Sequence, residues 1–103
     1  MTANEYGIIK DIIEDAYTAL RYNQNNIRDN DAYRSQHTAT RFTTCGMILQ
    51  HFQLDVKFGT WMDGEIEKIG FMSIEGFRIV ENGEWDYEQS RLLGDVLRHK
   101  VDA

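Results

Sequence analysis

The sequence predicts an α+β domain with the element order α-α-β-β-β-α. Apolar residues recur at helical spacing before residue 53 and again after residue 86, whereas between these segments they alternate as in strands. Three pairs that favour turns, Asp63-Gly64, Glu75-Gly76 and Asn82-Gly83, divide and close the alternating stretch, which indicates an antiparallel meander. Because 103 residues suit a single core, we expect residues 1–103 to form one small globular domain.

A first helix is predicted over residues 3–23. Thr2 and Glu5 have the spacing of a capping box, in which each side chain bonds the backbone N–H of the other residue. The apolar stripe of this helix recurs in steps of three and four and consists of Ile9, Ile12, Ile13, Ala16, Tyr17 and Leu20. The polar residues 23–26 that follow favour local side-chain hydrogen bonds over a continued helix, so they predict the first connection.

A second helix is predicted from a cap at Asn30 or Asp31 to about residue 53. Its core-facing positions form a heptad-like seam of Ser35, Thr38, Phe42, Cys45, Leu49 and Phe52. Gly46 indicates that another element approaches this helix closely. The seam can pack on the first helix or on a second copy of the chain, so a homodimer stays open.

Three strands are predicted, over residues 56–62, 65–74 and 77–80. Gly70 is expected to weaken or bulge the second strand. The competing interpretation is a short helix over residues 63–72, because Ile66, Ile69 and Met72 also fit a helical step. Gly64 and Gly70 disfavour that helix, so we prefer the strands.

The last helix is predicted to begin after Asp86, which forms a second capping-box pattern with Gln89. Arg98, His99 and Lys100 suit its final turn, where positive charge meets the negative end of the helix dipole. Its apolar stripe consists of Leu92, Leu93, Val96, Leu97 and Val101.

The formal net charge of −6 is concentrated between residues 63 and 88, where there are eight acids and two bases. Such a segment repels nucleic acid and attracts a basic protein surface. The other interpretation is that these acids only keep the domain soluble. The residues predicted to contact a partner are Trp61, Asp63, Glu65, Glu67, Glu75, Glu81, Glu84 and Asp86.

The leading hypothesis is a cytoplasmic, non-enzymatic interaction domain that inhibits or regulates a nucleic-acid-acting protein. Acids spaced along strands could imitate the charges of a phosphate backbone. Anti-restriction and anti-CRISPR proteins of mobile elements are a functional analogy for such a domain. The alternative is a winged-helix-like DNA-binding regulator that acts as a dimer through Arg34, His37 and Arg41. The acidic hairpin that would serve as its wing argues against direct binding of nucleic acid.

Catalytic, cofactor and metal chemistry is not predicted. Cys45 is the only cysteine, which excludes an internal disulfide and a cysteine-based zinc set. His37 and His51 would lie about 21 Å apart along one continuous helix, too far to share a metal. There is no apolar run long enough to span a membrane and no apolar stretch of a secretory signal, so we expect a soluble protein.

Overall fold

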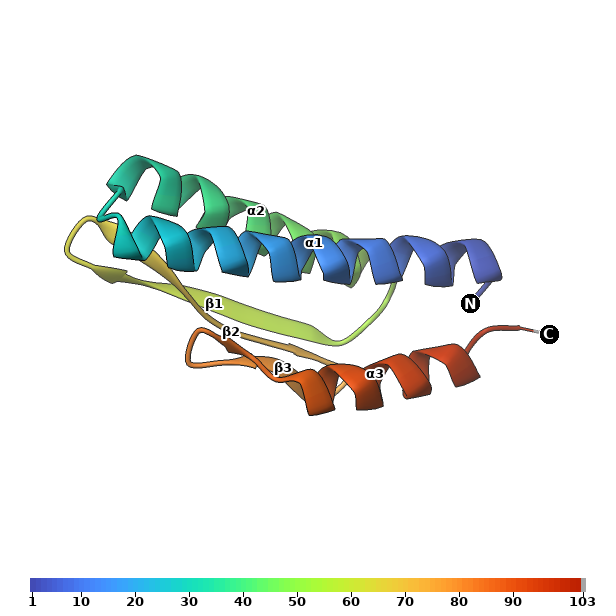
Figure 1. Cartoon of the computed structure of the whole chain (residues 1–103). Helices are drawn as coiled ribbons and strands as arrows, with labels where there is room; N and C mark the ends of the chain where they lie inside the picture. The colour runs from blue at the N-terminus through green and yellow to red at the C-terminus, as the bar shows by residue number, and fades with distance from the viewer. Residues whose placement is uncertain (103) are drawn as a thin grey trace.

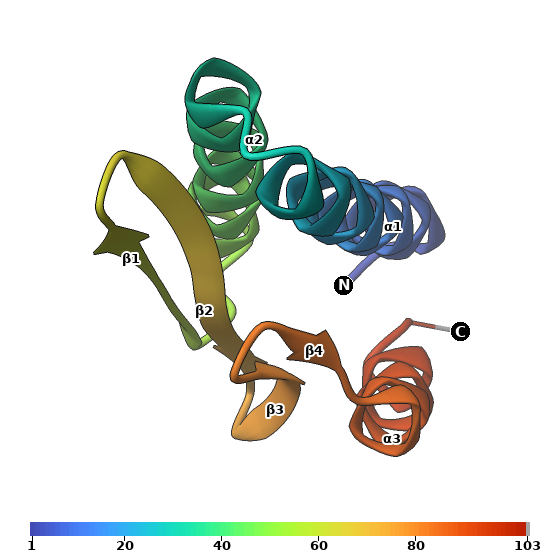
Figure 2. The same cartoon turned by 60° about the vertical axis from the view of Figure 1, so that its left-hand side comes forward.

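The computed structural model describes residues 1–102 and confirms an α+β architecture, with a sheet of four antiparallel strands where the sequence predicts three. The elements in chain order are α1 (Ala3–Arg28), α2 (Ala32–His51), β1 (Val56–Asp63), β2 (Ile66–Ile74), β3 (Phe77–Glu81), β4 (Glu84–Trp85) and α3 (Tyr87–His99). The strands are neighbours in the order β1-β2-β3-β4. α1 and α2 run side by side along β1 and β2, and α3 lies next to β3 (Figure 1). All three helices lie on one side of the sheet, which leaves its outer face uncovered (Figure 2).

The fourth strand follows from the turn at Asn82 and Gly83. Both residues have positive φ angles, +50° and +76°, which is the backbone of a two-residue hairpin. Glu84 and Trp85 therefore return along β3 and pair with Glu81 and Val80. A strand of two residues is too short to produce a periodic pattern, so the sequence predicts the turn but not the strand.

The turn between β1 and β2 lies one residue later than predicted. Asp63 pairs with Ile66, so the two central residues are Gly64 and Glu65. Gly64 has a positive φ of +63°, which a type II′ turn requires at its first central position. The competing helix over residues 63–72 is wrong, because this segment is the end of β1, a turn and most of β2. The shifted turn places Glu65 at the tip of the hairpin.

α1 continues to Arg28, past the residue 23 at which the sequence predicts its end. The reason is that Asn23 is buried and bonds other elements instead of its own backbone. Its Nδ2 donates to the carbonyl oxygens of Ser35 (3.1 Å) and Glu67 (2.9 Å), and its Oδ1 accepts from the N–H of Ile69 (3.2 Å). The amide therefore does not compete with the helix, and it joins α1, α2 and β2.

The core lies between the helices and the inner face of the sheet. The predicted stripe of α1 is buried or half-buried, and the seam of α2 is covered as well, with Phe42 and Leu49 at 0 % exposure. Because these side chains are covered within the chain itself, the seam is not exposed for packing against a second copy. The sheet contributes buried side chains from three strands, namely Val56, Ile69, Met72, Ile74, Ile79 and Val80.

Gly46 is the point of close approach between α2 and β1, as the sequence predicts. A Cβ atom at this position would lie 2.5 Å from Cδ1 of Phe58, well inside van der Waals contact. We expect Gly46→Ala to lower the free energy of unfolding by about 1–3 kcal/mol, because overpacking outweighs the better helix propensity of alanine. Chemical denaturation measures this loss. The matched control is Gly7→Ala in α1, where a Cβ meets nothing within 4 Å and stability should rise instead.

Candidate protein-binding surface

The β1–β2 hairpin extends beyond the helices at the end where α1 stops and α2 starts. Trp61 and Met62 are neighbours in β1, so their side chains point to opposite faces of the hairpin. Both are more than half exposed, at 52 % and 57 %. Because large apolar side chains are exposed on both faces of the hairpin, neither face is covered there by another part of the domain. We call residues 61–66, together with Asp29 in the α1–α2 connection, the hairpin end.

Hydrogen bonds at the base of the hairpin end fix its position. The N–H of Glu67 donates to Oγ of Ser35 (3.2 Å), and the neighbouring Ile69 N–H donates to Asn23 as described above. The hydroxyl of Thr60 on β1 donates across the hairpin to the Glu67 carboxylate (2.9 Å). Ile69, 2 % exposed, is the last inner-face residue of β2 that the helices bury before the tip. The hairpin end is thus a projecting segment on a rigid base.

Trp61 lies on the outer face of the sheet, and its ring lies next to a glycine of the neighbouring strand. Gly70 is the extra residue of a bulge in β2, as the sequence predicts, and a Cβ there would lie 3.4 Å from Cδ1 of Trp61. Lys68 Nζ lies 4.9 Å from the centroid of the Trp61 ring and 3.0 Å from the Asp63 carboxylate. Cation–π contact and the glycine together hold the ring in place. Further along this face, Arg78 lies over Phe71 in the same way, at 5.0 Å.

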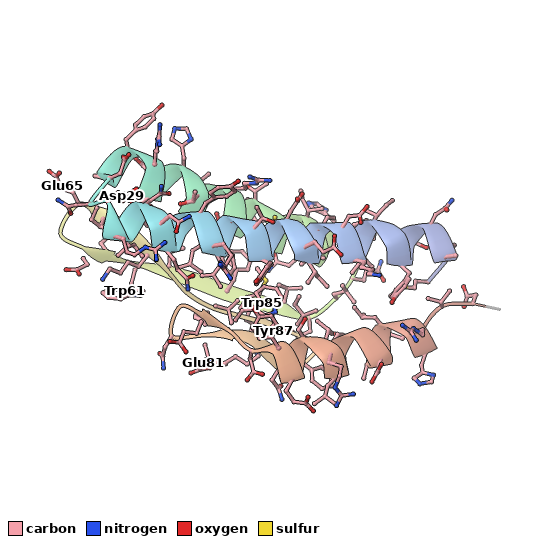
Figure 3. The ribbon with its side chains drawn as sticks, viewed as in Figure 1. Asp29, Trp61, Glu65, Glu81, Trp85 and Tyr87 are labelled. Atoms are coloured by element: carbon pink, nitrogen blue, oxygen red, sulfur yellow. The ribbon has the colours of Figure 1, made fainter. Side chains whose placement is uncertain are left out.

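Two exposed acids, Asp29 and Glu65, lie at the hairpin end with Trp61 (Figure 3). Within residues 1–102, neither carboxylate is in an ion pair or accepts a hydrogen bond. Asp63 is also exposed, but Lys68 balances its charge. The surface therefore combines apolar side chains with unbalanced negative charge, which is the composition of a protein interface with a steering rim.

The structure does not bring all eight predicted contact residues onto this surface. Trp61, Asp63, Glu65 and Glu67 lie together in the hairpin, although the Glu67 carboxylate is half-buried and bonded to Thr60. Glu75 lies at the other end of β2, where it pairs with Lys100 and accepts from the N–H of Asp55 (2.9 Å). These contacts lower the pKa of the Glu75 carboxyl, with the bond to Lys100 as the largest cause.

The remaining three predicted acids lie around the β3–β4 turn and the start of α3. Glu81 pairs with Arg78 (3.1 Å), and Asp86 is the N-cap of α3, where its carboxylate accepts from the N–H of Gln89 (3.0 Å). Glu84 is exposed beside Glu81. Asp86 forms only half of the predicted capping box, because its own N–H donates to the carbonyl of Ile79. Most acids of the segment therefore make bonds within the fold.

The residues of the DNA-binding alternative lie on the exposed side of α2. Arg34 pairs with Asp31 (3.6 Å), and Arg41 pairs with Asp15 of α1 (3.7 Å). The ring of His37 packs edge-on against Tyr33, with 4.5 Å between the centroids. Both arginines thus have an acid within ion-pair distance.

Cys45 is 6 % exposed, and burial raises the pKa of its thiol, so it is protonated at neutral pH. Among residues 1–102 no three His, Cys, Asp or Glu side chains converge as a metal site requires. Over the same range, none of the helices combines the length and apolar character that a membrane span needs.

Asp29 and Met62 belong to the hairpin end but are missing from the sequence-based prediction. Asp29 lies in a polar connection whose position relative to the hairpin only the tertiary fold reveals. Met62 continues the core alternation of β1, and only the end of helix cover leaves it exposed. Comparison of the chain with protein-family models, with curated proteins and with solved structures finds no match.

Proposed function

We propose that this chain is a non-enzymatic protein-binding domain that inserts its hairpin end into a basic groove of a partner protein. The observation that carries the proposal is the exposure of Trp61 and Met62 on opposite faces of one projecting hairpin. A hairpin with apolar side chains on both faces gains most when both walls of a groove cover it. Tryptophan is also one of the side chains enriched among the residues that contribute most of the binding energy at interfaces.

The charge of the hairpin end selects the partner. Asp29 and Glu65 are exposed and unbalanced among the described residues, so they favour a groove that carries lysine and arginine side chains. Proteins that act on nucleic acids need such grooves, because they must neutralise phosphates. We therefore place the partner in this class and infer that the domain inhibits or regulates it by occupying the nucleic-acid groove.

Affinity capture from native lysate, followed by mass spectrometry, tests this function. The wild-type domain should retain a protein with a basic groove, and an excess of duplex DNA should release it because both ligands occupy the same place. The control bait carries Ile8→Ser, which removes an exposed apolar side chain from the far end of α1 and should retain the same partner. A partner that DNA does not release would contradict occupation of the groove.

Reversing the charge of the hairpin end should slow association with this partner. We expect Asp29→Lys combined with Glu65→Lys to lower the association rate constant about tenfold or more at low salt. The difference should shrink at about 0.5 M salt, where the Debye length falls to about 4 Å. Surface plasmon resonance at several salt concentrations measures both effects.

The matched control for the charge reversal is Asp11→Lys combined with Asp55→Lys. It makes the same change in net charge at exposed positions away from the hairpin end. If this control slows association as much as the reversal at the hairpin end, then only the net charge of the domain matters. That result would contradict the assignment of the steering charges to Asp29 and Glu65.

A further inference from the structure

A groove separate from the hairpin end lies between α1 and α3. The two helices are antiparallel and lie on the same side of the sheet (Figures 1 and 2). The groove has a volume of about 460 Å³, within the range of small-molecule sites. Its apolar lining includes Ile13 of α1, Leu93 and Leu97 of α3, and Trp85 of β4. Leu93 and Leu97 are at most 2 % exposed, so they form its floor.

One end of the groove is aromatic. The ring of Tyr17 packs edge-on against Trp85, with 5.0 Å between the centroids. The hydroxyl groups of Tyr17 and Tyr87 are hydrogen-bonded at 2.8 Å, and this bond joins α1 to the start of α3. These three side chains line the groove.

The other end of the groove is basic. Lys10 and Arg98 both line it, near the start of α1 and the end of α3, and both are exposed. Within residues 1–102 neither side chain is in an ion pair. Arg91, by contrast, also lines the groove but pairs with Glu88 (2.6 Å) and Asp95 (3.3 Å). Glu14, an exposed acid of α1, also lines the groove one turn from Lys10 and is in no ion pair within the same range. The unpaired charges of the lining are thus two positive and one negative, in a chain of net charge −6.

Gly94 lies within α3 and lines the groove, and a Cβ at this position would meet nothing within 4 Å. Glycine inside a helix costs about 1 kcal/mol relative to alanine. Because a Cβ at this position meets open space, a larger side chain here would occupy part of the groove.

We propose that the α1–α3 groove binds a small amphipathic carboxylate, with its apolar chain along Leu93 and Leu97 and its carboxylate between Lys10 and Arg98. The lining from Tyr6 to Tyr17 spans about 16 Å along α1, which sets the length of the ligand. An apolar chain with one anionic group matches both the shape and the charge of the groove.

Decanoate is the probe that tests this site, and the tryptophan fluorescence of a Trp61→Phe variant reports on it. In that variant Trp85, which lines the groove, is the only tryptophan left. We expect a saturable change of the Trp85 emission with decanoate and none with acetate, which lacks the apolar chain. Decyltrimethylammonium, which has the same chain and the opposite charge, should bind at least about tenfold more weakly.

Substitutions in the groove complete the test. Gly94→Leu should abolish the decanoate response while the domain stays folded, since the new side chain enters open space. The matched control, Gly7→Leu, makes the same change at a helical glycine outside the lining and should bind normally. Lys10→Gln combined with Arg98→Gln should weaken binding about tenfold, as the loss of a charge-assisted contact does.

Three results would overturn the proposal. The first is an unchanged decanoate response in folded Gly94→Leu, and the second is equal binding of decanoate and decyltrimethylammonium. The third is a dimer, detected by sedimentation of the wild-type chain, that Gly94→Leu dissociates. That outcome would assign the groove to a second copy of the chain.

Discussion

Replacing Asn23 with leucine should lower the free energy of unfolding by about 3 kcal/mol or more. Asn23 is 1 % exposed and makes hydrogen bonds to both α2 and β2. Leucine has a similar volume but leaves the Ser35 and Glu67 carbonyls and the Ile69 N–H without this partner. Each buried polar group that loses its partner costs about 1–3 kcal/mol. Chemical denaturation followed by circular dichroism measures the loss.

The matched control for Asn23 is Asn25→Ala, in the same helix and the same polar run. Asn25 is exposed, and among residues 1–102 its side chain bonds only Arg28, so the change should stay within about 0.5 kcal/mol. If Asn23→Leu costs no more than this control, then the amide network does not hold the hairpin to the helices. That result would contradict the rigid base that we assign to the hairpin end.

Replacing Trp61 with serine should weaken partner binding by at least about 30-fold, or about 2 kcal/mol. Trp61 is 52 % exposed on the outer face, and a groove wall would bury the rest of its ring. The expected loss of stability is about 1 kcal/mol or less, because the side chain is already half exposed on the outer face of the sheet. Titration of the captured partner into each variant by calorimetry measures the affinity.

Two variants separate the role of the Trp61 ring from a general loss of apolar surface. Trp61→Phe keeps an aromatic ring above Gly70 and should recover much of the binding energy. Ile8→Ser removes an exposed side chain from α1 and should leave the affinity unchanged. Equal weakening by Ile8→Ser and Trp61→Ser would remove Trp61 as the anchor of the interface.

Local signals account for most of the secondary structure. The capping box at Thr2, the periodic stripes and the glycine-containing turns each depend on residues close in sequence. The structure confirms them, except that the β1–β2 turn lies one residue later than predicted. The end of α1 is different, because the side chain of Asn23 bonds residues far away in the sequence. Local propensity favours a turn at such a residue, and the tertiary network outweighs it.

The candidate surface is only partly visible in the sequence for the same reason. Charge counting finds Glu65 and Asp63, and strand alternation finds Trp61. Charge counting also selects Glu75 and Asp86, but in the fold Glu75 forms an ion pair and Asp86 caps a helix. Whether an acid is exposed or engaged depends on what the fold brings beside it, so composition alone cannot separate the two groups.

Photo-crosslinking from the hairpin end tests the central claim most directly. Benzoylphenylalanine replaces Met62, which is 57 % exposed on the hairpin, and in a second variant it replaces Ile48, which is 40 % exposed on α2. We predict a covalent adduct with the captured partner from position 62 and none from position 48, with the attached peptide in the basic groove of the partner. An adduct from position 48 without one from position 62 would contradict binding through the hairpin end.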